Sequence, residues 1–301
     1  MSVRAELMRL GLRLFVKRVH PSVAHARAGT HAIERLVPSP PKEARTSPVD
    51  AGGVPGVLTT AARSRPDRHV LFLHGGAYVT GTQTLYRNFL WRIATTMRAE
   101  VLFVDYRLAP EHPFPAALDD AFAAWQWLIA AKAAPQRTVI MGDSAGGGLT
   151  LALLLKLRDE NNAQPGAAVA LSPWTDLAFT GDSLIRNGKS DPMLTVAGAR
   201  ILAESYLGDT DPRHPYVSPL YGDPTGLPPT LIHVGSDEIL LDDSLRMAHA
   251  MRTAGCHVEI EVWPRMPHVW HAAAPAIPES NAAIARIGAF VDAMLTVDDE
   301  E

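Results

Sequence analysis

The stretch TVIMGDSAGGGLTLALLLKLR (residues 138–158) decides the fold of this chain. Residues 138–141 are mostly β-branched and apolar, which predicts a short buried strand, and the leucine-rich residues 147–158 have the length of a helix. The five residues Gly142-Asp143-Ser144-Ala145-Gly146 between them form the pattern G-x-S-x-G. An ordinary glycine-rich turn can carry the same letters. A position between strand and helix instead favours a sharp turn that exposes the Ser144 hydroxyl, with glycines where a Cβ would clash.

Apolar segments of strand length alternate with helical segments along the rest of the chain. Strands separated by helices predict an α/β fold with a mostly parallel central sheet and helices on both faces. Further strands are expected at Val70–Leu73, Val101–Val104, Ala167–Leu171, Thr230–Val234 and His257–Trp263. Further helices are expected at Ala116–Ala131, Val196–Leu207, Asp243–Ala254 and Glu279–Leu295.

The domain organisation predicted from length and pattern is one domain over residues 1–301, with a helical cap. The cap is expected to combine residues 1–45 with an insertion at about 176–214, which lengthens one connection on the carboxyl side of the sheet. Residues 37–57 are rich in proline, serine and glycine and are expected to form loop and strand edge. Residues 2–19 form an amphipathic helix, expected to pack on the protein body, with a membrane surface as the alternative.

Charge and cysteine content exclude several classes of function. The chain has 28 Lys and Arg against 32 Asp and Glu, a net charge of −4, so no nucleic-acid surface is expected. The single cysteine, Cys256, excludes an intrachain disulfide, and the fold needs no oxidising compartment. No secretory signal is visible and the apolar run at 149–155 is too short to span a bilayer. We therefore expect a cytoplasmic protein with no stable membrane insertion.

A serine hydroxyl needs a base, usually histidine, and a carboxylate that orients this histidine. In the α/β-hydrolase arrangement these groups follow in the order Ser, Asp or Glu, His, each on a loop after a strand. Asp237 follows the strand at 230–234, and His268 follows the strand at 257–263. The predicted catalytic residues are therefore Ser144, Asp237 and His268.

Neighbouring residues offer alternatives for the acid and the base. Glu238 is adjacent to Asp237, whereas Asp242 and Asp243 are expected to be first-turn acids of the next helix. His271 is three residues beyond His268, but the distance from the strand favours His268.

A second loop is expected to supply the oxyanion hole. His74-Gly75-Gly76-Ala77 follows the strand at 70–73, where α/β hydrolases place this loop. The predicted donors are the backbone N–H groups of Gly75, Gly76 and Ala145, of which the last opens the helix after Ser144. His74 is expected to brace the loop by hydrogen bonding.

Four motifs together resemble those of the bacterial hormone-sensitive-lipase-like esterases within the α/β-hydrolase fold. They are residues 74–78 (HGGAY), residues 105–111 (DYRLAPE), residues 142–147 (GDSAGG), and the loops of Asp237 and His268. The resemblance covers about residue 57 to the C-terminus and implies a structural role for residues 106–117. The chain departs from the family at Ala77, where the motif often has a third glycine, and at Val269-Trp270, where Gly-Phe often follows the base.

The resemblance implies hydrolysis of small carboxylic esters with short to medium acyl chains, without a metal or an organic cofactor. Family members are often dimers, so a homodimer is compatible with it. An amide, N-acetyl or lactone hydrolase uses the same triad and stays an alternative, as does a non-catalytic hydrolase fold that binds a ligand. Candidate substrate-pocket walls are Tyr78, Trp174, Leu202, Tyr206 and Val269.

Overall fold

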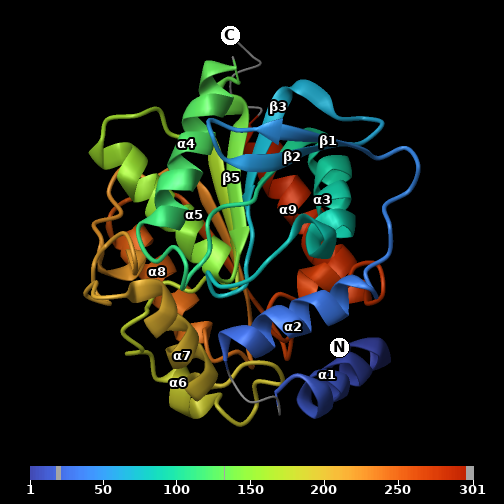
Figure 1. Cartoon of the computed structure of the whole chain (residues 1–301), viewed down its shortest axis with the longest axis vertical. Helices are drawn as coiled ribbons and strands as arrows, with labels where there is room; N and C mark the ends of the chain where they lie inside the picture. Colours follow the sequence, from blue (N-terminus) through green and yellow to red (C-terminus); the bar gives the residue numbers. More distant parts are fainter. Residues whose placement is uncertain (18–21, 132, 296–301) are drawn as a thin grey trace.

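The structure is a computed structural model and describes residues 1–17, 22–131 and 133–295 (Figure 1). Its centre is an eight-stranded sheet in the order β1-β2-β4-β3-β5-β6-β7-β8. β2 pairs antiparallel with β1 and β4, whereas β3 to β8 run parallel to one another. The strands are β1 (Arg45–Asp50), β2 (Pro55–Thr60), β3 (Arg65–Leu73), β4 (Ala99–Val104), β5 (Thr138–Asp143), β6 (Ala167–Leu171), β7 (Thr230–Gly235) and β8 (Val258–Trp263).

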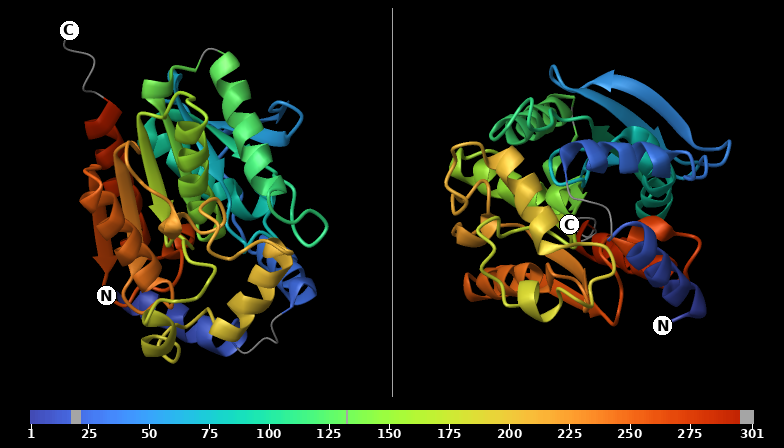
Figure 2. Two further views of the ribbon diagram at one scale, coloured as in Figure 1. Left: turned by 90° about the vertical axis from the view of Figure 1, so that its left-hand side faces the viewer. Right: turned by 60° about the horizontal axis from the view of Figure 1, so that its bottom comes forward.

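Helices connect the strands and cover both faces of the sheet (Figure 2). The α-helices are α1 (Val3–Phe15), α2 (Val23–Glu34), α3 (Gln83–Met97), α4 (Ala116–Ala130), α5 (Ala145–Asp159), α6 (Ser183–Arg186), α7 (Val196–Leu207), α8 (Leu241–Thr253) and α9 (Pro278–Leu295). Short 3-10 turns lie at Pro135–Arg137, Pro219–Tyr221 and Trp270–Ala273.

Successive strand residues pack on opposite faces, which explains the continuous apolar runs. In β3, Leu71 and Leu73 join the core under α4, α5 and α8, whereas Val70 and Phe72 join the core under α3 and α9. Every second side chain of a strand points to the same face, so a strand covered on both faces needs apolar residues throughout. The predicted α/β fold with a mostly parallel sheet is confirmed.

Two parts of the architecture differ from the sequence-based expectation. Residues 45–60 form the hairpin of β1 and β2, where loop and strand edge were expected, and β1 is mostly exposed. Helix α3 was not predicted, although its buried residues, which include Phe89, Leu90, Ile93 and Met97, recur at helical spacing.

The chain reverses its direction across the sheet at β3, because β4 lies on one side of β3 and β5 on the other. Such a switch point opens a crevice at the carboxyl ends of the strands. The loop after β3 carries His74–Ala77 and the turn after β5 carries Ser144. The two loops therefore meet where α/β proteins commonly bind ligands.

Helices α1, α2, α6 and α7 gather at one end of the molecule, the lower end in Figure 1. Lys17, two residues after α1, contacts the segment after α6, because its Nζ donates hydrogen bonds to the carbonyls of Gly188 (2.8 Å) and Asp191 (2.5 Å). Residues 1–45 and 176–214, predicted to form a cap, thus contribute to the same end. Over the described ranges, no helix combines the length and apolar character needed to cross a membrane.

Candidate active site

Ser144 lies on the turn between β5 and α5 with φ 54° and ψ −120°. Positive φ is unusual for a residue with a side chain, and three hydrogen bonds hold it here. The Ser144 N–H donates to the Leu171 carbonyl (2.8 Å), and its carbonyl accepts from Gly148 N (3.0 Å) and Trp174 N (3.0 Å). A Cβ at Gly146 would collide with the Leu73 backbone, so the close approach of α5 to β3 requires glycine.

His268 lies on the loop after β8 and contacts the serine directly. Its Nε2 is 2.8 Å from Ser144 Oγ, and its Nδ1 is 2.7 Å from Glu238 Oε2. The His268 side chain is 4% exposed. Serine, imidazole and carboxylate thus form one continuous chain of hydrogen bonds, the geometry of a nucleophile, a base and an orienting acid.

The carboxylate beside His268 is not the predicted one. No hydrogen bond joins the described residues Asp237 and His268; Asp237 Oδ2 accepts a hydrogen bond from Arg9 of α1 (2.6 Å), and its Oδ1 accepts from Ser236 Oγ (3.0 Å). Glu238 is fully buried and occupies the position beside the imidazole. A turn in which Glu238 N donates to Gly235 O folds the longer side chain back to the end of β7 and leaves Asp237 facing α1.

Several groups fix the Glu238 carboxylate. Its Oε1 accepts hydrogen bonds from Ser172 Oγ (2.7 Å) and Gly235 N (2.6 Å). Asp191 holds the backbone of the residue after Glu238, because Asp191 Oδ2 accepts a hydrogen bond from Ile239 N (2.9 Å). A carboxylate held by this many donors keeps a fixed orientation toward the imidazole. Ser172 and Asp191 were not singled out from the sequence, which shows no pattern that links them to residues 238–239.

The environment of His268 favours its charged form. Burial alone would lower the pKa of His268, but the hydrogen bond and charge of Glu238, with the charges of Asp191 and Asp143, outweigh it. The pKa of His268 is therefore raised above its ordinary value of 6.5. His271, the alternative base, is fully buried against His233, and burial holds its pKa well below the ordinary value.

The amides of the loop after β3 also differ from the prediction that Gly75 and Gly76 are the free donors. The Gly75 N–H is already used, because it donates to Tyr86 Oη (2.9 Å) and Asp143 Oδ1 (3.0 Å), so Gly75 is not a free oxyanion donor. In the described part of the chain, no hydrogen bond takes the N–H of Gly76, Ala77 or Ala145. Gly76 and Ala77 have φ values of 117° and 54°, a left-handed turn whose amides are free for a ligand.

Asp143, Tyr86 and His74 hold this loop in place. Tyr86 Oη donates to Asp143 Oδ2 (2.9 Å), and burial raises the pKa of Asp143 to about 6. His74 stacks on Tyr106 with ring centroids 4.1 Å apart, and burial lowers its pKa to about 4. A neutral His74 whose Nδ1 bonds the Gly75 carbonyl (2.8 Å) has the bracing geometry expected of it. Tyr106 Oη also donates to the His74 carbonyl (2.6 Å).

Comparison with known proteins identifies the family. Residues 70–272 match a family described by the alpha/beta hydrolase fold. A curated acetyl-hydrolase of Streptomyces hygroscopicus is 45% identical over 236 residues, which cover 77% of this chain and 79% of the relative. A crystal structure of an esterase from the bacterial hormone-sensitive lipase family superposes with a TM-score of 0.94 at 39% identity, covering 98% of this chain and 99% of that one.

The chain belongs to the bacterial hormone-sensitive-lipase family of α/β hydrolases. It is a carboxylic ester hydrolase, because named esterases match most of its length. Among them, a structure of EstE5 soaked with p-nitrophenyl butyrate superposes with a TM-score of 0.93 at 37% identity, covering 98% of this chain and 99% of that one.

The residues predicted to line the esterase pocket are mostly packed into the core. Tyr78 and Tyr206 stack with centroids 3.7 Å apart, and Trp174 lies 6.5 Å from Tyr78. All three are at most 3% exposed, whereas Leu202 and Val269 are half-buried. Because Tyr206 belongs to α7, the stacked pair ties the cap helix to the loop that carries Gly76 and Ala77.

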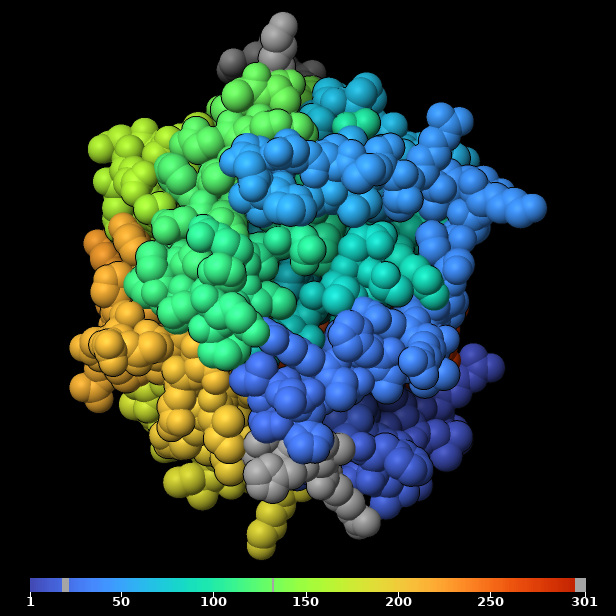
Figure 3. All heavy atoms as spheres, in the orientation of Figure 1, coloured from blue at the N-terminus to red at the C-terminus, as the bar shows by residue number. Residues whose placement is uncertain are grey.

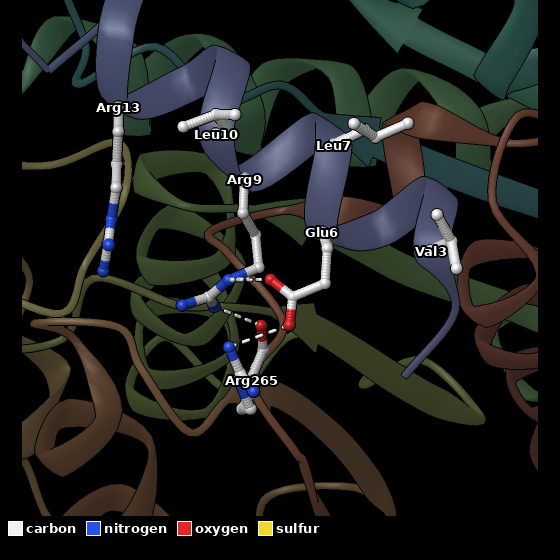
Figure 4. Close-up of a pocket in the computed structure, with 7 residues that line it drawn as sticks. All are labelled: Val3, Glu6, Leu7, Arg9, Leu10, Arg13 and Arg265. Atoms are coloured by element: carbon white, nitrogen blue, oxygen red, sulfur yellow. Dashed lines mark hydrogen bonds and ion pairs between the residues drawn. The ribbon is translucent and has the colours of Figure 1, made fainter.

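Helix α1 of the esterase is joined to the two loops that carry Glu238 and His268. Arg9, 5% exposed, donates to Asp237 and to the Arg265 carbonyl. Figure 4 shows Glu6, Arg9 and Arg13 extending from α1 to the side where Arg265 lies. A hollow of about 370 Å³ along this helix does not include Ser144, Glu238 or His268. In the described residues, no group of three or more His, Cys, Asp or Glu side chains is arranged to hold a metal ion.

Proposed function

We propose that Ser144, His268 and Glu238 form the catalytic triad of this ester hydrolase and that it acts on esters with short to medium acyl chains. The observation that carries the proposal is the hydrogen-bond chain from Ser144 Oγ through His268 to Glu238. Serine is a poor nucleophile unless a base removes its proton, and this chain provides the base and its orientation.

The reaction proceeds through an acyl-enzyme. Ser144 Oγ attacks the ester carbonyl carbon while His268 Nε2 takes the hydroxyl proton. Collapse of the tetrahedral intermediate breaks the bond to the alcohol, which leaves with that proton from His268. Water then attacks the acyl-serine and loses a proton to His268. When the bond between the acyl carbon and Ser144 Oγ breaks, His268 returns this proton to Oγ, which releases the acid and regenerates the Ser144 hydroxyl. Glu238 stays ionised and stabilises the imidazolium.

Three backbone amides are placed to hold the oxyanion. The N–H groups of Gly76 and Ala77 come from the loop after β3, and that of Ala145 opens α5, whose dipole favours negative charge. The proposed donors of this loop are therefore Gly76 and Ala77, in place of the predicted Gly75 and Gly76. The departure from glycine at Ala77 leaves its N–H unchanged, so it is compatible with this role.

The chain-length proposal is tested with a series of p-nitrophenyl esters. Support comes from the relative named an acetyl-hydrolase and from the EstE5 structure soaked with a butyrate ester. The stacked Tyr78 and Tyr206 fill space beneath α7, which favours a short acyl site. We expect kcat/KM to be highest for acetate to hexanoate esters and to fall for decanoate and longer esters. Higher rates on the long esters would contradict the proposal.

Hydrolysis of another acyl bond is the second candidate, because the same triad serves amides and lactones. Matched p-nitroanilides and lactones are measured beside the esters. An enzyme that is inert on all the esters and cleaves the amides would replace the proposed function.

The raised pKa of His268 predicts the pH dependence. Only the neutral imidazole acts as a base, so kcat/KM is expected to rise with pH through the pKa of His268, above 6.5. Glu238→Gln removes the carboxylate charge that raises this pKa, so the residual activity should rise at a lower pH. Both profiles come from initial rates on one soluble ester. A midpoint below 6.5 in the unsubstituted enzyme, or one that Glu238→Gln leaves unchanged, would contradict the proposed role of Glu238.

A further inference from the structure

Large apolar side chains exposed to solvent gather on the cap helices. The described residues contain twelve such side chains, and ten of them lie on α1, α2, α6 or α7 or within two residues of these helices. Large apolar patches on a folded protein mark surfaces that contact another phase or molecule. Figure 3 shows the blue spheres of α1 and α2 as part of the molecular surface.

Helix α1 carries the most regular part of this patch. Val3, Leu7, Leu10 and Leu14 recur at helical spacing, and their exposed fractions are 78%, 64%, 54% and 41%. Another side of the helix packs inward, where Ala5 and Met8 join the apolar cluster of Trp270 and Ile277 and Arg9 bonds Asp237. Figure 4 shows that Leu7 and Leu10 do not point to the side where Glu6 and Arg9 reach Arg265. An amphipathic helix normally exposes a polar face, but α1 exposes this stripe in addition to the apolar side that it packs on the protein body.

The exposed cations of α1 and α2 include arginines without an acidic partner. Arg4 and Arg13 donate to backbone carbonyls, those of Ala276 (3.5 Å) and Ser190 (3.0 Å), which leave their charges in place. Of the described residues, none offers a carboxylate within ion-pair distance of Arg4, Arg13 or Arg35. The two acids of α1 and α2 are engaged: Glu6 pairs with Arg9 and Arg265, and Glu34 accepts from Thr82 and pairs with His31.

The same imbalance is visible in the sequence. The first 36 residues contain seven Lys and Arg against two acids, although acids outnumber these cations over the whole chain, 32 to 28. The positive charge is therefore concentrated on the part of the chain that exposes the apolar stripe.

We propose that the exposed face of α1 and α2 docks on an anionic lipid surface. Apolar side chains enter the headgroup region while the exposed arginines of these two helices attract anionic headgroups, which is how interfacial helices bind. A second copy of the chain fits less well, because a two-fold contact through this face would bring the same unneutralised arginines together. Docking requires no spanning helix.

Docking at this face would place the lipid surface at the end of the molecule that carries the active site. Arg9 connects α1 to Asp237 and to the Arg265 carbonyl, on the loops that also carry Glu238 and His268. The inference concerns where the enzyme resides, so it stands or falls independently of the proposed acyl-chain preference.

The test is co-sedimentation of the full chain with phosphatidylcholine vesicles that contain or lack phosphatidylglycerol. We expect binding to the anionic vesicles that weakens as salt is added, and less binding to phosphatidylcholine alone. The double variant Leu7→Gln/Leu10→Gln should bind these vesicles more weakly, by roughly tenfold or more. Arg4→Gln/Arg13→Gln should lose about tenfold on the anionic vesicles and little on the neutral ones.

The matched control is Leu245→Gln/Val262→Gln, which removes two exposed apolar side chains that lie outside the cap, 39% and 41% exposed. This variant should bind like the unsubstituted protein, and thermal unfolding verifies that each variant is folded. The proposal is overturned if the protein does not bind anionic vesicles, or if folded Leu7→Gln/Leu10→Gln binds as well as the control. Light scattering that shows a dimer dissociated by this variant would assign the face to a second copy.

Discussion

Replacing Ser144 with alanine is expected to lower kcat by roughly 10⁴- to 10⁶-fold. In the proposed reaction Ser144 Oγ is the atom that bonds to the acyl carbon. The backbone N–H and carbonyl of residue 144 are held by hydrogen bonds that alanine keeps. The measurement is kcat on p-nitrophenyl acetate, with residual activity referred to the buffer rate. The small remainder reflects binding and the oxyanion amides.

Labelling distinguishes the loss of the nucleophile from a loss of structure. A fluorophosphonate probe should label one serine of the unsubstituted protein, Ser144, and should not label folded Ser144→Ala. A protein that stays unlabelled while it hydrolyses esters would show that Ser144 is not the nucleophile.

Replacing Glu238 with glutamine is expected to lower kcat about 10⁴-fold. An amide in this position can present its NH₂ to His268 Nδ1, which stabilises the wrong tautomer of the ring and removes the charge that balances the imidazolium. Because Glu238 is fully buried and nearly isosteric with glutamine, the fold should tolerate the change. Steady-state kinetics on a soluble ester measure it, and an effect below tenfold would remove Glu238 from the triad.

The fold was predictable because most of its strands and helices follow from patterns of residues that are neighbours in the sequence. β5 and the turn at Ser144 could be read from consecutive apolar residues and closely spaced glycines, and β6 and α7 begin and end where expected. The β1–β2 hairpin was hidden because an exposed edge needs no apolar pattern, and its Pro and Gly residues suggested loop. The helical spacing in α3 was present in the sequence and was overlooked.

Ser144 and His268 were predicted to the residue and contact each other, whereas the carboxylate and the free amides were predicted only to the loop. Asp237 and Glu238 are adjacent acids at the end of one strand, and their roles depend on which of them Arg9 engages, more than 200 positions away. Gly75 and Gly76 are likewise neighbours, and Gly75 is excluded as a donor by Tyr86 and Asp143. These contacts join residues that are distant in sequence, so neither the acidic pair nor the glycine pair indicates them.

The central claim, that Glu238 orients His268, is tested most directly by comparing kcat of Glu238→Gln with that of Asp237→Asn under identical conditions. Asp237 accepts hydrogen bonds from Arg9 and Ser236, so its substitution should reduce kcat less than about tenfold, although it weakens the hydrogen bond to Arg9 of α1. The account predicts that Glu238→Gln is slower than Asp237→Asn by about 10³-fold or more. A folded Asp237→Asn that is the slower of the two would contradict it and return the acid to Asp237.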